Sequence, residues 1–193
     1  MSQRYEVRIS GTGGQGVVLA AIIMAEAAAA GRKGQKVVQT VHYGPQVRGG
    51  LSNAELVISN KDIDYPLPIG LDLVIPFTEQ AMDESAPLMK ENGVIIYDPA
   101  LVPKVREGWA APIPLTQLAI DTTGRKQMAN IVALGAALVF CPHLNAAGFT
   151  FALQARAPQG LAEAFSKAAA VGEKAARKIK GHLRFAATPS PED

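Results

Sequence analysis

The segment Gly11-Thr12-Gly13-Gly14-Gln15-Gly16 decides how this chain folds. A strand-like run at residues 5–10 precedes it, and a long alanine-rich run at residues 17–30 follows it. This order predicts a strand, a tight turn and a helix, because glycine accepts the backbone angles that such a turn requires. The segment also matches G-x-G-x-x-G, in which backbone N–H groups and a helix N-terminus face a phosphate.

A second glycine-rich segment, His42-Tyr43-Gly44-Pro45-Gln46-Val47-Arg48-Gly49-Gly50, follows another strand-like run at residues 36–41. Both segments are expected to leave the same, carboxyl edge of a parallel sheet, where α/β proteins usually bind ligands. Arg48, flanked by glycines, offers a planar fork of donors suited to a carboxylate or a phosphate. A salt bridge that holds the loop or joins two subunits is an equally open alternative.

A dinucleotide site is the first alternative that the G-x-G-x-x-G pattern suggests. Such a site requires an acidic residue at the end of the second strand, where it binds the ribose hydroxyls. Here that strand ends Gln39-Thr40-Val41-His42, and Glu26 lies too early, inside the helix. The pair Gly13-Gly14 is denser in glycine than a turn needs, so contact with a ligand or a partner is favoured over a merely permissive turn. We expect both glycines to sit where a Cβ atom would clash or where φ is positive.

The composition fits one globular unit. The chain has 193 residues, of which 48% are hydrophobic and 19% charged, and its net charge of +2 gives no reason to expect nucleic acid binding. The N-terminus lacks an apolar signal segment and no apolar stretch is long enough to span a bilayer, so a cytoplasmic location is expected. The single cysteine, Cys141, cannot form an internal disulfide or hold an iron–sulfur cluster, and the three histidines share no metal-binding spacing.

Alternating strand-like and helix-like segments predict an α/β fold. We expect a single three-layer domain over residues 1–183, with a mostly parallel or mixed sheet flanked by helices, and a flexible tail over residues 184–193. The expected strands are 5–10, 37–41, 54–58, 71–77, 93–97 and 109–115, and the expected helices are 17–30, 79–90, 126–140 and 157–183, with a helical turn at 115–120. Thr78 is expected to cap the helix that begins at Glu79.

The two glycine segments together resemble the γ subunit of 2-oxoacid:acceptor oxidoreductases. This family includes the pyruvate, 2-oxoglutarate, 2-oxoisovalerate, indolepyruvate and phenylglyoxylate oxidoreductases. The resemblance covers about residues 5–180 and includes, after the glycine segments, Ser52–Ser59 (SNAELVIS), Asp72–Ile75 (DLVI), Gly93–Asp98 (GVIIYD) and Asn130 with Leu134-Gly135.

The resemblance implies a non-autonomous subunit of a multi-subunit enzyme that oxidatively decarboxylates a 2-oxoacid to an acyl-CoA. Thiamine diphosphate, Mg²⁺ and [4Fe-4S] clusters would lie on partner subunits of the α, β and δ types. Coenzyme A would be the co-substrate, and ferredoxin or another acceptor would take the electrons. This chain would help to enclose coenzyme A and hold the subunits together.

The positions carried over as cofactor-binding are Gly11, Thr12, Gly13, Gly14, Gln15, Gly16, Tyr43, Gly44, Arg48, Gly49, Gly50 and Asn130. No residue is assigned a catalytic or metal-binding role. Whether the loops contact coenzyme A or only partner subunits stays open, as do the identities of the 2-oxoacid and the acceptor. Two other hypotheses remain: a self-contained, nucleotide-binding Rossmann-like oxidoreductase, and a purely structural assembly subunit.

Overall fold

The computed structural model of the chain describes residues 4–43, 50–105 and 108–186. Its strands form one seven-stranded mixed sheet in the order β2-β3-β1-β4-β5-β6-β7. The strands are β1 (Arg4–Thr12), β2 (Lys36–Tyr43), β3 (Leu51–Ser59), β4 (Leu71–Pro76), β5 (Met89–Tyr97), β6 (Gly108–Pro112) and β7 (Arg184–Ala186). This arrangement confirms the expected α/β class with a mixed sheet.

The sheet changes direction on both sides of its parallel centre. Strands β1, β4, β5 and β6 run parallel, whereas β3 and β7 run antiparallel to their neighbours. Thr12 pairs with Leu51 and Tyr43 pairs with Ser52, so both glycine segments leave the same edge, as expected. The expectation of a parallel sheet at this place is wrong, because β3 lies between β1 and β2. Residues 44–50 join β2 directly to β3, and a parallel connection needs a dozen or more residues.

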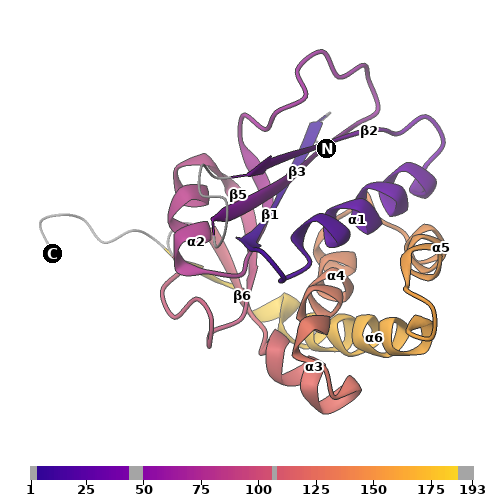
Figure 1. Cartoon of the computed structure of the whole chain (residues 1–193). Coiled ribbons are helices and arrows are strands. Elements are labelled where there is room, and N and C mark those ends of the chain that lie inside the picture. The colour runs from indigo at the N-terminus through magenta and orange to yellow at the C-terminus, as the bar shows by residue number, and fades with distance from the viewer. Residues whose placement is uncertain (1–3, 44–49, 106–107, 187–193) are drawn as a thin grey trace, which may run out of the picture.

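Helices cover both faces of the sheet unequally. They are α1 (Val17–Gly31), α2 (Glu79–Ser85), α3 (Leu115–Thr123), α4 (Ala129–Phe140), α5 (Ala146–Arg156) and α6 (Ala162–Ile179), with 3₁₀ turns η1 (Ala86–Leu88), η2 (Lys126–Met128) and η3 (Lys180–His182). Figure 1 shows α2 on one face and the other helices on the opposite face. There α1 packs against β3, β2 and β1, and α4 packs against α6. The expected three layers are therefore present.

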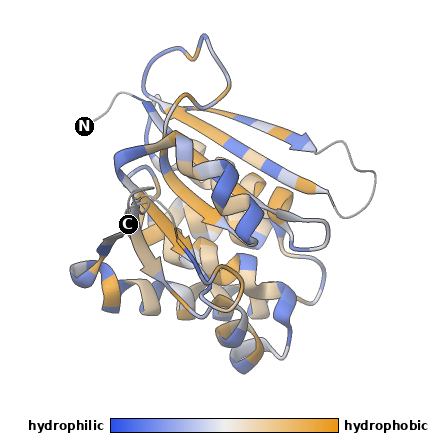
Figure 2. Cartoon of the chain, turned by 90° about the vertical axis from the view of Figure 1, so that its left-hand side faces the viewer, coloured by the Kyte–Doolittle hydropathy of each residue, from blue (hydrophilic) through white to orange (hydrophobic). Residues whose placement is uncertain are grey.

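The two faces of the sheet differ in chemistry. On the face covered by α1 and α4, residues such as Val7, Leu56 and Ile75 are buried in one large apolar core. On the face toward α2, alternate positions of the same strands carry buried polar side chains such as Arg8 and Glu55. In Figure 2 the outer side of α2 is hydrophilic, in front of strands with long hydrophobic segments. The period-two alternation of a strand therefore places the large apolar core on one face and, on the other, buried polar side chains next to a small apolar cluster of Met82, Ile95 and Val102.

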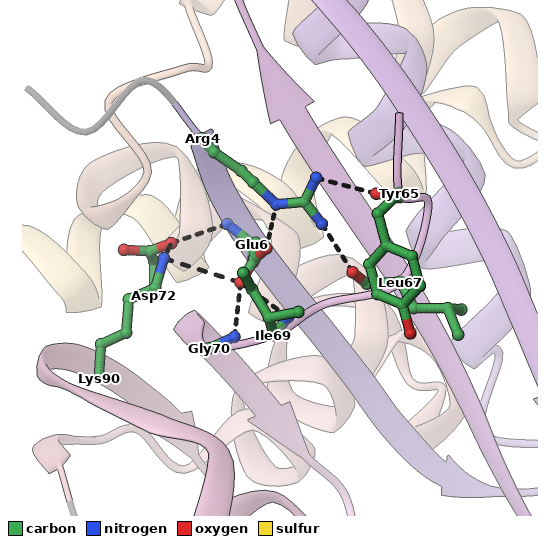
Figure 3. Close-up of polar contacts among 8 residues, drawn as sticks. All are labelled: Arg4, Glu6, Tyr65, Leu67, Ile69, Gly70, Asp72 and Lys90. Carbon is green, nitrogen blue, oxygen red and sulfur yellow. Dashed lines mark hydrogen bonds and ion pairs between the residues drawn. The ribbon is translucent and has the colours of Figure 1, made fainter. Parts of the chain in front are cut away.

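An ionic network, defined here as Arg4, Glu6, Asp72 and Lys90, fastens the proline-containing loop 60–70 to the sheet (Figure 3). The Glu6 carboxylate, which is fully buried, accepts from the Gly70 N–H at 2.7 Å and pairs with Arg4. Arg4 in turn donates to two carbonyl oxygens of the loop, and Lys90 binds Asp72 at 2.5 Å. The buried carboxylate is thus satisfied on several sides, which is the condition for a charge to remain buried.

Several element boundaries differ from the sequence expectations. The helix after Thr78 ends at Ser85 rather than Lys90, because Pro87 follows and the chain enters β5 at Met89. The cap is confirmed, since Thr78 Oγ1 accepts from the Ala81 N–H. The strand at 109–115 ends at Pro112.

Near the C-terminus the helix expected at 157–183 begins only at Ala162, and α5 was not expected at all. Residues 184–186, expected to begin a tail, form β7 against β6, while residues 187–193 lie outside the described part. In the parts of the chain that the structure describes, no helix is both long and apolar enough to cross a membrane.

Candidate functional site at the glycine loop

The first glycine loop, residues 12–16, turns the chain from β1 into α1 with two left-handed glycines. Gly14 has φ +87° and Gly16 has φ +70°, conformations that disfavour any residue with a Cβ. The expectation for Gly14 is therefore confirmed. The expectation for Gly13 is wrong, because its φ is not positive and no atom lies within 4 Å of the place that a Cβ would take. The fold of this chain does not explain why residue 13 is glycine.

The Gln15 side chain fixes the loop to the neighbouring strand. Its Oε1 accepts from the Thr12 N–H at 2.7 Å, and its Nε2 donates to the Phe77 carbonyl at 3.3 Å. A Cβ on Gly11 would collide with this amide. Gln15 and Gly11, both expected at a cofactor, thus hold the loop in shape.

Asn130 connects the loop to α4, more than a hundred residues later in the sequence. Its side chain is almost fully buried, and its Nδ2 donates to the Gly16 carbonyl at 3.1 Å. A Cβ on Gly16 would strike the same amide. The structure thus brings two of the expected site residues together and gives Asn130 a positioning role.

The loop presents the N-terminus of α1 without a side-chain cap. Gly16 occupies the N-cap position, where no side chain can accept from the first N–H groups of the helix. Gly13 and Gly14 are both exposed. Uncapped N–H groups and the positive end of the helix dipole favour an anion, although nothing in this geometry alone identifies one.

Two cavities share Gly14 and Gln127 in their linings. The first, of about 240 Å³, is lined by Gly14, Gln15, Phe77, Leu101, Thr116, Lys126, Gln127 and Ala129. The second, of about 290 Å³, is lined by Gly14, Gly16, Leu19, Arg125, Gln127, Met128, Asn130, Pro158, Leu161 and Phe165. Arg125 and Lys126 were not predicted from the sequence as site residues, because two cations before an apolar helix are common on protein surfaces. Only the fold places them beside the glycine loop.

Arg125 and Lys126 are cations that line the two cavities beside the glycine loop. Both side chains are exposed, and neither makes an ion pair within the described residues. By contrast, Arg8, Lys90 and Arg156 are paired with carboxylates. The two free cations make the surroundings of Gly14 attractive to anions.

The second glycine segment is only partly described. Tyr43 ends β2 with 71% of its surface exposed, and Gly50 precedes β3. The positions Gly44, Arg48 and Gly49 lie outside the described residues, so the roles expected of them stay predictions.

A buried ion pair lies beside this second segment and was missed from the sequence. Glu55 accepts from Arg8 Nε at 2.8 Å, and its Oε2 lies 3.6 Å from His42 Nε2. The alternation of charged and apolar residues in β1 was the available signal, since alternate positions share a face.

No activated nucleophile accompanies the loop among the titratable groups described. Burial raises the pKa of the Cys141 thiol to about 12, and burial also raises the pKa of the neighbouring Tyr5 hydroxyl. A protonated, buried thiol is a poor nucleophile. Cys141 is a core residue on the evidence of its burial.

The described side chains of this chain do not suit the [4Fe-4S] clusters or the Mg²⁺ ion that the family resemblance implies for the whole enzyme. One cysteine cannot replace the four thiolates that a [4Fe-4S] cluster needs. Within the described residues, no three His, Cys, Asp or Glu side chains gather to hold a metal ion.

Comparisons with known proteins place the chain in a family. The pattern of the pyruvate ferredoxin/flavodoxin oxidoreductase family matches residues 6–178. The 2-oxoglutarate synthase subunit KorC of Methanocaldococcus jannaschii is 40% identical over 141 residues, covering 70% of this chain and 74% of the relative. KorC of Archaeoglobus fulgidus is 38% identical over 136 residues, covering 70% of each chain.

Solved structures agree with this placement. The γ subunit of a keto/oxoacid ferredoxin oxidoreductase from Geobacter sulfurreducens has a TM-score of 0.81 and 35% identity, covering 94% of this chain and 99% of that one. A 2-oxoglutarate:ferredoxin oxidoreductase from Magnetococcus marinus shares the fold, with a TM-score of 0.79 and 19% identity, over 100% of this chain and 34% of that one. The chain belongs to the pyruvate ferredoxin/flavodoxin oxidoreductase family and is a γ-type, non-autonomous subunit of a 2-oxoacid:ferredoxin oxidoreductase.

Proposed function

We propose that this subunit serves a thiamine-diphosphate-dependent complex that oxidatively decarboxylates 2-oxoglutarate and forms the corresponding acyl-CoA. The chain helps to enclose coenzyme A at its first glycine loop and contacts the catalytic subunits beside it. Electrons leave through [4Fe-4S] clusters on partner subunits to ferredoxin or another acceptor. The complex works in the cytoplasm.

The observation that carries the coenzyme A assignment is that Gly14 lines two cavities, each of which is also lined by a cation without an ion pair in the described residues. Coenzyme A is a long ligand with a pyrophosphate in its middle and a further phosphate at one end. Exposed glycines, an uncapped helix N-terminus, Arg125 and Lys126 are suitable partners for these phosphates. The open space around Gly13 supports the same assignment. A side chain at residue 13 would not clash with this chain, so the glycine there leaves room for a bound ligand.

The choice of 2-oxoglutarate rests on the relatives. KorC proteins of several archaea are 38–40% identical to this chain and are named as 2-oxoglutarate synthase subunits. The Magnetococcus marinus enzyme was solved with 2-oxoglutarate, coenzyme A and succinyl-CoA bound. In that enzyme the matching region is part of a longer chain, which supports tight contact between this subunit and catalytic partners.

The Rossmann-like alternative fits the sheet poorly. A dinucleotide-binding unit places its second strand parallel and next to the first, whereas β3 runs antiparallel to β1 at this position. The purely structural alternative requires that the glycine loop contact only protein, and it is separated from the proposal by coenzyme A kinetics.

The test is an assay of the complex purified through a tag on this chain. We expect 2-oxoglutarate to reduce a viologen dye only when coenzyme A is present, with much weaker activity on pyruvate and 2-oxoisovalerate. The isolated chain should be inactive. A complex that prefers another 2-oxoacid would overturn the substrate assignment, and turnover without any need for coenzyme A would overturn the enclosure role.

A further inference from the structure

The two cavities beside the glycine loop share Gly14 and Gln127 but differ in their other walls. We name them the Arg125 cavity and the Lys126 cavity after the cation that lines each. Because both cavities are lined by Gly14 and Gln127, a single elongated ligand that passes over Gly14 can reach both. Each half of that ligand must then suit the chemistry of its own cavity.

The Arg125 cavity combines apolar walls with one guanidinium. The apolar walls come from Leu19 of α1, from Leu161 just before α6 and from Phe165 of α6, and Met128 of η2 also lines the cavity. Asn130, its buried amide, is already bonded to the Gly16 carbonyl. The cavity therefore suits a flat, weakly polar ring with a phosphate nearby, and Arg125 is the available phosphate ligand.

The guanidinium of Arg125 is free to take this role. It makes no ion pair within the described residues, and its backbone is fixed by the hydrogen bond from the Arg125 N–H to Thr123 Oγ1. A terminal phosphate monoester carries close to two negative charges near neutral pH and offers three oxygens. Arginine binds such a group through two parallel hydrogen bonds, which a lysine cannot reproduce.

The Lys126 cavity has a different lining. Phe77, Leu101 and Ala129 provide apolar contacts. Thr116 and Gln127 provide groups that can hydrogen-bond to amides, whereas the Gln15 amide is already bonded to Thr12 and Phe77. This mixture suits a narrow chain that alternates methylene and amide groups. The cavity is also the smaller of the two, at about 240 Å³.

We propose that coenzyme A crosses Gly14 in one direction, with its adenosine 3′-phosphate end in the Arg125 cavity and its pantetheine arm in the Lys126 cavity. Arg125 binds the 3′-phosphate, and the pyrophosphate lies over the glycine loop near Lys126. Arg125 is then the residue by which this subunit distinguishes coenzyme A from 3′-dephospho-coenzyme A. The assignment rests on the proposed function, since it takes coenzyme A as the ligand of the loop.

The experiment compares coenzyme A with 3′-dephospho-coenzyme A as co-substrates of the intact complex. With the unchanged chain, the apparent KM should be about tenfold lower for coenzyme A, the difference expected of one charge-assisted contact. Arg125→Ala should raise the KM for coenzyme A by about the same factor and leave that for the dephospho compound unchanged. Arg125→Lys should recover only part of the preference.

Two further variants provide the contrast. Lys126→Ala should raise both KM values equally, because the pyrophosphate is common to the two compounds. Lys178→Ala removes an exposed cation from the distal half of α6 and should change neither. If Arg125→Ala keeps the preference for coenzyme A, the assignment of the 3′-phosphate is wrong, although the proposed function stands. If the complex oxidises its 2-oxoacid without using either compound, the proposed function itself is wrong.

Discussion

Gly13 and Gly16 lie three residues apart in one loop, yet the fold of the chain requires glycine only at the second. Gly16 has a positive φ and its missing side chain leaves room for the Asn130 amide. Gly13 has an ordinary φ and open space around it. Folding therefore requires glycine at position 16 but not at position 13, where we expect the glycine to serve binding.

We predict that Gly16→Ala lowers the free energy of unfolding by about 2–4 kcal/mol, since it combines backbone strain with overpacking against Asn130. Gly13→Ala should change it by less than about 0.5 kcal/mol. Urea denaturation of the isolated chain measures both. Equal destabilisation by the two variants would contradict this description of the loop.

Gly13→Val extends the comparison to the complex. The variant should fold normally and yet raise the apparent KM for coenzyme A by about tenfold or more, because the added side chain occupies space next to the ligand. Unchanged complex yield and unchanged kinetics would mean that the loop is only a turn.

Cys141 permits a prediction about pH. Burial raises the pKa of the Cys141 thiol from 9.0 to about 12. Between these two pH values the thiol stays protonated in the folded chain but is ionised in the unfolded chain. The stability that this protonation contributes is complete below pH 9.0 and is lost as the pH rises through about 12. A thiol-specific reagent should therefore label native chain slowly at about pH 8 and label denatured chain at once. Rapid labelling of the native chain would show that Cys141 is not buried as described.

At the scale of the elements, the two ends of β1 make different contacts. One end bears the ionic network that holds loop 60–70, and the other carries the glycine loop. The ionic network stabilises the scaffold, because each of its charged side chains is paired with an opposite charge of the network.

Glu6→Ala should lower the free energy of unfolding by on the order of 3 kcal/mol, since it leaves the Gly70 N–H and a cation without their buried partner. The matched control is Asp62→Ala in the same loop. Asp62 pairs with Lys36, and both side chains are largely exposed, so its loss should cost less than about 1 kcal/mol. Urea denaturation compares the two, and similar costs would contradict a structural role for the buried network.

The close crossing of α4 and α6 explains why residue 135 is glycine. The family resemblance includes Gly135 but gives no physical reason for it. A Cβ on Gly135 would enter the carbonyl of Ala169, and one on Gly172 would enter the carbonyl of Val132. Gly135→Ala should therefore force the helices apart and destabilise the chain by about 3 kcal/mol or more. The matched control is Gly181→Ala, where no atom lies within 4 Å of the added Cβ, and it should be nearly neutral. Thermal unfolding compares the two variants. A neutral Gly135→Ala would mean that the helices cross less closely than described.

At the scale of the whole molecule, apolar runs were sufficient to predict most strands and the first helix. The orientation of β3 was missed, although the short connection over residues 44–50 carried the information. α5 was missed because residues 146–156 were given no element, since the Asn145 cap that starts α5 was not recognised.

The site was predictable only in part, for a physical reason. Gly14, Gly16 and Asn130 belong to a motif whose glycines mark backbone requirements that a sequence displays. Arg125 and Lys126 acquire their importance only from the packing of η2 beside the loop, and no local pattern records that contact. Long-range neighbours of this kind are fixed by the topology of the sheet and its helices.

The central claim is that coenzyme A lies against the first glycine loop of this subunit. Hydrogen–deuterium exchange of the purified complex, with and without coenzyme A, tests it most directly. Coenzyme A should slow exchange at residues 12–19 and 125–130, whereas 2-oxoglutarate alone should not. A complex that turns over with coenzyme A while exchange in both segments stays unchanged would contradict the account.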